Sequence, residues 1–117
     1  MTTRECYALM DADYNDTLSR LVSDSLIRRL LFKFAESKDL ELLTNAINQK
    51  DYETAFRISH SLKGVSLNLG FTKLTDSSCA LCEDLRDGSP SDNTNVLLET
   101  MTCDYQQALS AIRQLDG

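Results

Sequence analysis

The chain of 117 residues contains a single histidine, His60, and a lysine and a glycine follow it three and four positions later. A neutral imidazole nitrogen can attack phosphorus and hold a phosphoryl group in a labile N–P bond. Because the transfer builds negative charge on the phosphoryl oxygens, a nearby cation such as Lys63 can offset it. Gly64 has no side chain and would leave room for a second protein to approach His60. One histidine also excludes any site that needs two imidazoles.

Residues 51 to 69 are predicted to form the helix that carries these three residues. Asp51 is a suitable N-cap, because its carboxylate can accept hydrogen bonds from the free amides of the first turn. At about 100° per residue, His60 lies nearly opposite the inward side, and Lys63 and Gly64 share its outer face. Two overlapping sets are expected to face inward: Ala55, Ile58, Leu62, Val65 and Leu69, and a seam of Ala55, Ser59, Leu62, Ser66 and Leu69.

Apolar residues also occur near the outer face of this helix. Phe56 and Leu67 lie close to His60 on the helical wheel, with Arg57 at the edge, and exposed apolar side chains of this kind suit a docking surface. However, a histidine on a helix is often an ordinary solvated residue, and a His–Lys pair at this spacing is common by chance. Phe56 and Leu67 could also lie partly under a neighbouring helix. Geometry alone leaves these interpretations open.

The rest of the chain shows the same helical periodicity, with short links and no alternating strand pattern. Four glycines, one proline and no tryptophan disfavour a turn-rich β sandwich or barrel. Helix-stop residues at Asp87-Gly88 and capping residues from Asp92 to Thr94 precede a final helix. We therefore expect a single all-α domain over 1–117. It would be an antiparallel up-and-down four-helix bundle (core about 37–116) with an N-terminal helical extension (about 4–35).

Composition limits the partners. The formal net charge is −6, which disfavours nucleic acid because such binding depends on basic contacts to phosphates. No stretch approaches the ~20 apolar residues of a membrane span, and the first residues do not resemble a signal peptide. We therefore expect a cytoplasmic monomer with free thiols that binds neither nucleic acid nor membrane.

The pattern Cys79-Ala80-Leu81-Cys82 raises an alternative, a thiol or zinc site. Structural zinc needs four ligands, whereas Cys6 and Cys103 stand alone in the sequence and His60 is expected to face outward on another helix. Redox pairs of the thioredoxin type lie at a helix N-terminus, and here the pair falls in mid-helix. Cys82 is instead expected to be a buried, inert thiol, and no metal site is predicted.

The segment from Ala55 to Gly70 reads AFRISHSLKGVSLNLG and closely resembles the signature of histidine-containing phosphotransfer (HPt) domains, H-x-L-K-G followed by N-L-G. The flanks also fit this family. Residues 48–53 resemble its short turn before the phosphorylated helix, and residues 74–85 resemble its next helix. The resemblance covers roughly residues 15 to 115, and the family's fold is the bundle expected above.

The resemblance implies a role for each matching residue. His60 would accept the phosphoryl group through the ring nitrogen that faces solvent, Lys63 would stabilise it, and Gly64 would keep the approach open. Phe56, Arg57 and Leu67 would belong to the surface that docks a receiver domain. Ser66 and Asn68 match small polar positions of the motif and are taken as structural.

As an HPt domain, the protein would be a phosphorelay carrier and not an enzyme. It would take a phosphoryl group from a receiver aspartate, or a kinase, and pass it to another receiver aspartate. It would need no cofactor of its own, since no glycine-rich ATP loop is present and magnesium would reside in the receiver. The alternative is a helical adaptor without phosphotransfer, against which the intact His60, Lys63 and Gly64 argue.

Overall fold

The computed structural model describes residues 1–115, which form seven α-helices and no strand. The helices are α1 (Thr3–Leu9), α2 (Tyr14–Leu21), α3 (Asp24–Ala35), α4 (Asp39–Asn48), α5 (Tyr52–Leu69), α6 (Thr72–Asp84) and α7 (Thr94–Arg113).

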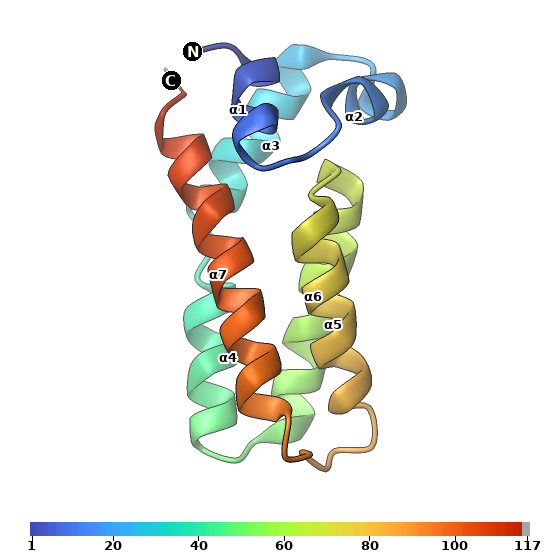
Figure 1. The fold of residues 1–117 in the computed structure, drawn as a ribbon, viewed down its shortest axis with the longest axis vertical. Coiled ribbons are helices and arrows are strands. Elements are labelled where there is room, and N and C mark those ends of the chain that lie inside the picture. Colours follow the sequence, from blue (N-terminus) through green and yellow to red (C-terminus); the bar gives the residue numbers. More distant parts are fainter. Residues whose placement is uncertain (116–117) are drawn as a thin grey trace.

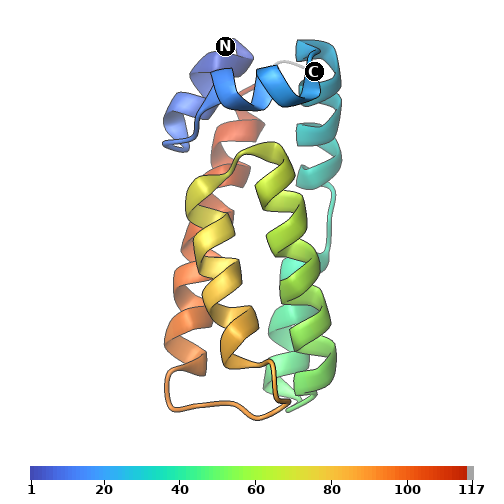
Figure 2. The same cartoon turned by 90° about the vertical axis from the view of Figure 1, so that its right-hand side faces the viewer.

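Four helices, α4 to α7, run side by side along the long axis of the molecule and alternate in direction (Figure 1). α3 lies above α4, to which a short link connects it, and packs beside the C-terminal half of α7. α1 and α2 close that end, and α2 crosses above the turn between α5 and α6 (Figure 2). The predicted all-α four-helix bundle with N-terminal helices is confirmed.

The ends of the helices agree in part with the signals in the sequence. Asp51 is the N-cap of α5, and its carboxylate accepts a hydrogen bond from the Thr54 amide, as predicted. α6 ends at Asp84, before the predicted stop at Asp87-Gly88. α7 begins at Thr94, and its N-cap residue Asn93 makes no side-chain capping hydrogen bond. The hydroxyl of Thr94 instead donates to Asp84 Oδ2 at 2.6 Å. Of the expected capping residues, Thr94 therefore ties the start of α7 to the end of α6.

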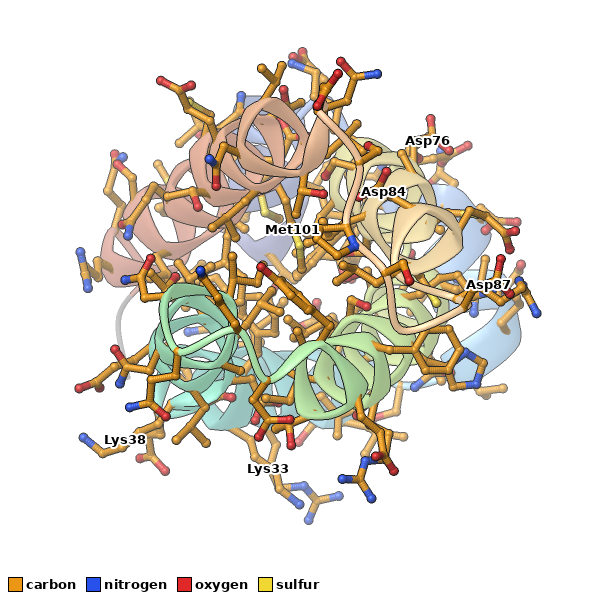
Figure 3. The ribbon with its side chains drawn as sticks, turned by 90° about the horizontal axis from the view of Figure 1, so that it is seen from below. Lys33, Lys38, Asp76, Asp84, Asp87 and Met101 are labelled. Carbon is orange, nitrogen blue, oxygen red and sulfur yellow. The ribbon has the colours of Figure 1, made fainter. Side chains whose placement is uncertain are left out.

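The bundle core is apolar, with a seam of small residues between α5 and α6. Met101 points into its centre in the view along the bundle (Figure 3) and is fully buried. The seam of Ala55, Ser59, Leu62, Ser66 and Leu69 is buried as predicted. Two of its serines donate to carbonyls of their own helix, Ser59 to Phe56 and Ser66 to Leu62. Small side chains with internally satisfied hydroxyls allow α6 to pack closely against α5.

Val65 was expected to face inward, and this prediction is wrong. It is 39% exposed, whereas Ile58 is half-buried. The buried stripe of α5 follows the small residues toward α6 instead. Val65 therefore lies at the edge of the buried stripe of α5 and lines a groove with Leu30 and Lys33 of α3.

The N-terminal helices hold the C-terminal end of α5. The carbonyl of Leu69 accepts hydrogen bonds from Tyr7 Oη (2.7 Å) and Thr17 Oγ1 (3.2 Å). Arg20 donates to the neighbouring carbonyl of Asn68 at 2.9 Å. These donors satisfy carbonyls that a helix end leaves without partners. The helix stops at Gly70, which has a left-handed backbone (φ +77°).

None of the helices within residues 1–115 is both long and apolar enough to cross a membrane. The predicted division into a core from 37 to 116 and an N-terminal part from 4 to 35 stays a prediction, and residue 116 lies outside the described residues.

Gly70 and Gly88 form a matched pair for testing the contact between α2 and α5. Both have positive φ, but a Cβ at Gly70 would lie 2.0 Å from Thr17 Oγ1, whereas at Gly88 it would meet nothing within 4 Å. Gly88→Ala should lower the free energy of unfolding by about 1–2 kcal/mol from backbone strain alone. Gly70→Ala should lose about 1–3 kcal/mol more from overpacking. Urea unfolding measures both, and equal losses would contradict the contact.

Candidate functional site

His60 lies in the middle of α5 with an exposed side chain, on the side away from the buried seam, as predicted. Lys63 is half-buried one turn further along, and Gly64 is exposed. The three residues therefore share one face of a helix that is capped at its start and held at its end. They sit on a rigid element and not on a loop.

Two side chains contact the imidazole. The ring of Phe56, one turn earlier on α5, is stacked with that of His60 at 19° between planes and 6.2 Å between centroids. On the side of α6, the Sγ atom of Cys82 lies 3.9 Å from Nδ1 of His60. Cys82 is fully buried. Nδ1 therefore faces protein. Because the side chain as a whole is exposed, Nε2 is left as the nitrogen available to a partner.

Lys63 supplies positive charge next to His60. No carboxylate of residues 1–115 forms an ion pair with its amine. Glu83 on α6 is affected by this charge: its pKa is lowered chiefly by its hydrogen bonds from Arg86 and also by the charge of Lys63. Because Arg86 already neutralises Glu83, the ammonium of Lys63 is available to an incoming anion.

Gly64 opens the surface beside His60. A Cβ at this position would meet nothing within 4 Å, so glycine is not needed for packing inside the molecule. A groove of about 770 Å³ begins at Gly64 and Leu67 and extends to α2 and the start of α6. Arg20 of α2 and Asp76 of α6 line its far side, and Asp76 points outward in Figure 3.

The three residues predicted to dock a partner differ in exposure. Leu67 is 63% exposed, which is unusual for a leucine and fits a contact surface. Arg57 is exposed and lies 4.0 Å from Glu53, one turn earlier, in a loose ion pair. Phe56 is only half-buried and packs on the imidazole, so it supports His60 as well as bordering the face.

The four cysteines are free thiols in the structure. Burial raises the pKa of Cys6 to about 11, which makes it a poor nucleophile at neutral pH. Cys82 is buried as predicted, but its contact with His60 was not expected. Among residues 1–115, no three histidine, cysteine or acidic side chains are grouped so that they could hold a metal ion.

The contact with Cys82 is the part of the site that the sequence did not indicate. A helical wheel for α5 places His60 outward, but it does not show which residue of the next helix reaches the edge of that face. The sequence feature that could have indicated this contact is the position of Cys82 beside the inward residues Leu81 and Leu85, next to a seam of small residues. Because the side chains between α5 and α6 are small, residues at the edges of the two helices come into contact.

The fold and the site define a class of protein, a small helical bundle that presents one histidine on its surface next to a lysine and an open glycine. The family model of the Hpt domain matches residues 29–115. The match covers most of the chain, and the chain therefore belongs to the Hpt domain family. No match was found among curated proteins or among solved structures.

Membership in this family has general consequences. An Hpt domain is a phosphotransfer intermediate of a phosphorelay and contains no kinase catalytic domain. Hpt domains interact with receiver domains and histidine kinases. The resemblance inferred from the sequence is confirmed, whereas the roles of individual residues stay predictions.

Replacement of Gly64 tests whether the glycine lowers the stability of the domain. Glycine inside a helix is about 1 kcal/mol less favourable than alanine, and the added methyl group would meet open space. Gly64→Ala should therefore raise the free energy of unfolding by about 0.5–1 kcal/mol, measured by urea unfolding. A loss of stability would show that Gly64 serves packing within the domain.

Proposed function

We propose that His60 carries the phosphoryl group in this phosphorelay, on its Nε2 atom. It would receive the group from the aspartyl phosphate of a receiver domain, or from a kinase, and donate it to another receiver aspartate. The observation that supports this assignment is the environment of the imidazole, whose Nδ1 lies against Cys82 although the side chain as a whole is exposed. His60 is also the only histidine of the chain.

The transfer exchanges one bond to phosphorus for another. The lone pair of Nε2 attacks the phosphorus, an N–P bond forms, and the P–O bond to the receiver aspartate breaks, leaving its carboxylate with the electron pair. Nδ1 retains its proton throughout. Donation to the next receiver is the same exchange in reverse, with that receiver's carboxylate as the attacking group.

Lys63 and Gly64 would contribute in different ways. The ammonium of Lys63 would offset the charge that develops on the phosphoryl oxygens. Gly64 would let the receiver approach closely enough to align its aspartate with Nε2. Leu67, with Arg57 and Phe56 at the margin, would form the docking surface around them. A cytoplasmic location and a monomeric state belong to the same proposal.

Replacement of His60 tests the assignment directly. Receiver domains charged with acetyl [³²P]phosphate and Mg²⁺ should transfer label to the wild-type protein as an acid-labile, base-stable phosphate. His60→Gln should remove the label completely, because glutamine has no nucleophilic ring nitrogen. Since the side chain is exposed, helicity by circular dichroism should stay unchanged.

Two results would contradict the carrier assignment. One is label that persists in His60→Gln. The other is a wild-type protein that binds receivers of its own cell but takes label from none of them and from no histidine kinase; that result would favour the adaptor alternative.

Replacement of Lys63 tests the role of the neighbouring charge. Lys63→Ala should slow phosphoryl transfer by about 10-fold or more, because a positioned cation contributes a few kcal/mol where charge develops. Lys38→Ala is the matched control, because Lys38 is exposed just before α4 and points away from the bundle (Figure 3). Rapid-quench kinetics with a charged receiver measures both variants. Equal rates for the two variants would remove Lys63 from the mechanism.

A further inference from the structure

The two nitrogens of the His60 ring have different surroundings, and the difference comes from the neighbouring helix. Nδ1 is 3.9 Å from Sγ of Cys82. This distance lies at the long end of the range for a hydrogen bond to sulfur, and the sulfur is fully buried. The ring of Phe56 lies against the imidazole from within α5. The imidazole is thus held with one nitrogen directed inward, although the residue as a whole is exposed.

A neutral imidazole carries one proton, and the nitrogen that holds it cannot attack phosphorus. Attack by Nε2 therefore requires the proton to be on Nδ1. The partner of one ring nitrogen decides which of the two is protonated. An exposed histidine with no partner would not hold the reactive tautomer preferentially, so the site needs an acceptor near Nδ1.

Cys82 is the polar side chain that the structure places at Nδ1. Glu83, the next residue on α6, is turned to Arg86 and accepts its hydrogen bonds. Ser59 and Ser66, in the seam below, donate to carbonyls of α5. The sulfur of Cys82 is a weak acceptor, but burial protects it from competition by water.

We propose that Cys82 is a positioning residue for His60: its sulfur accepts a hydrogen bond from Nδ1–H and so keeps Nε2 unprotonated. The consequence for phosphotransfer depends on the proposed role of His60, whereas the tautomer itself does not. This gives a function to one cysteine of the Cys79–Cys82 pair that requires neither a metal nor a disulfide.

The single histidine makes the tautomer directly measurable. In protein labelled with [¹⁵N]histidine, the two ring-nitrogen shifts at pH 8 should show mainly the Nδ1–H tautomer. Cys82→Ala should shift the population toward Nε2–H. Cys82→Ser should restore Nδ1–H, because serine and alanine have similar volumes and differ in the acceptor oxygen.

The nucleophilicity of His60 can be measured as its rate of modification by diethyl pyrocarbonate. This rate should fall about twofold to tenfold in Cys82→Ala, the range of one weak hydrogen bond. It should recover in Cys82→Ser.

Cys79→Ala is the matched control, because it removes a half-exposed thiol from the same helix and should change neither the tautomer nor the rate. A wild-type protein mainly in the Nε2–H tautomer would overturn the proposal, as would equal tautomer populations in wild type and Cys82→Ala. The wild-type spectrum decides even where a variant does not fold. Failure of the carrier assignment is seen separately, as phosphate label that survives in His60→Gln.

Discussion

α5 and α6 pack through a seam in which the side chains are mostly small, and the distance between these two helices sets the geometry of the site. Ser59, Ser66 and Ser78 are fully buried where larger apolar residues would keep the helices apart. A polar seam costs stability unless its hydroxyls are satisfied. Ser59 and Ser66 donate to carbonyls of α5, whereas the hydroxyl of Ser78 has no partner within the described residues. The result is a close approach that places a buried sulfur of α6 beside an exposed ring of α5.

The N-terminal helices hold the C-terminal end of α5 in place through hydrogen bonds. Donors from Tyr7, Thr17 and Arg20 reach the last carbonyls of α5, and Thr17 leaves no space for a side chain at Gly70. The family match begins at residue 29, so α1 and α2 lie outside it. They nevertheless bond to the helix that carries His60. In this chain, the residues that hold α5 therefore include some outside the range that the family model matches.

Sequence periodicity predicted what depends on a single helix. The 3–4 spacing placed His60, Lys63 and Gly64 on one outer face, and Asp51 was identified as the cap because capping is a local interaction. The exposure of Val65 and the contact between Cys82 and His60 were not predicted, because both depend on how a second helix lies against α5. The left-handed backbone at Val22 (φ +69°) had no signal either, since a β-branched residue disfavours that conformation. Features that depend on one helix can therefore be predicted from sequence, whereas contacts between helices can be identified only once their packing is known.

An exposed imidazole with one lysine beside it is an incomplete reaction centre. Electrostatic stabilisation of a transition state is strong only where water is excluded. The surface around His60 is open to water, because His60 and Gly64 are both exposed and no side chain covers Gly64. In the proposed transfer, the docked receiver must therefore cover the site, contribute the metal and exclude water, while the bundle contributes a nucleophile in a fixed orientation. The formal net charge of the protein is −6, so the cation of Lys63 beside His60 is a local exception to the overall charge.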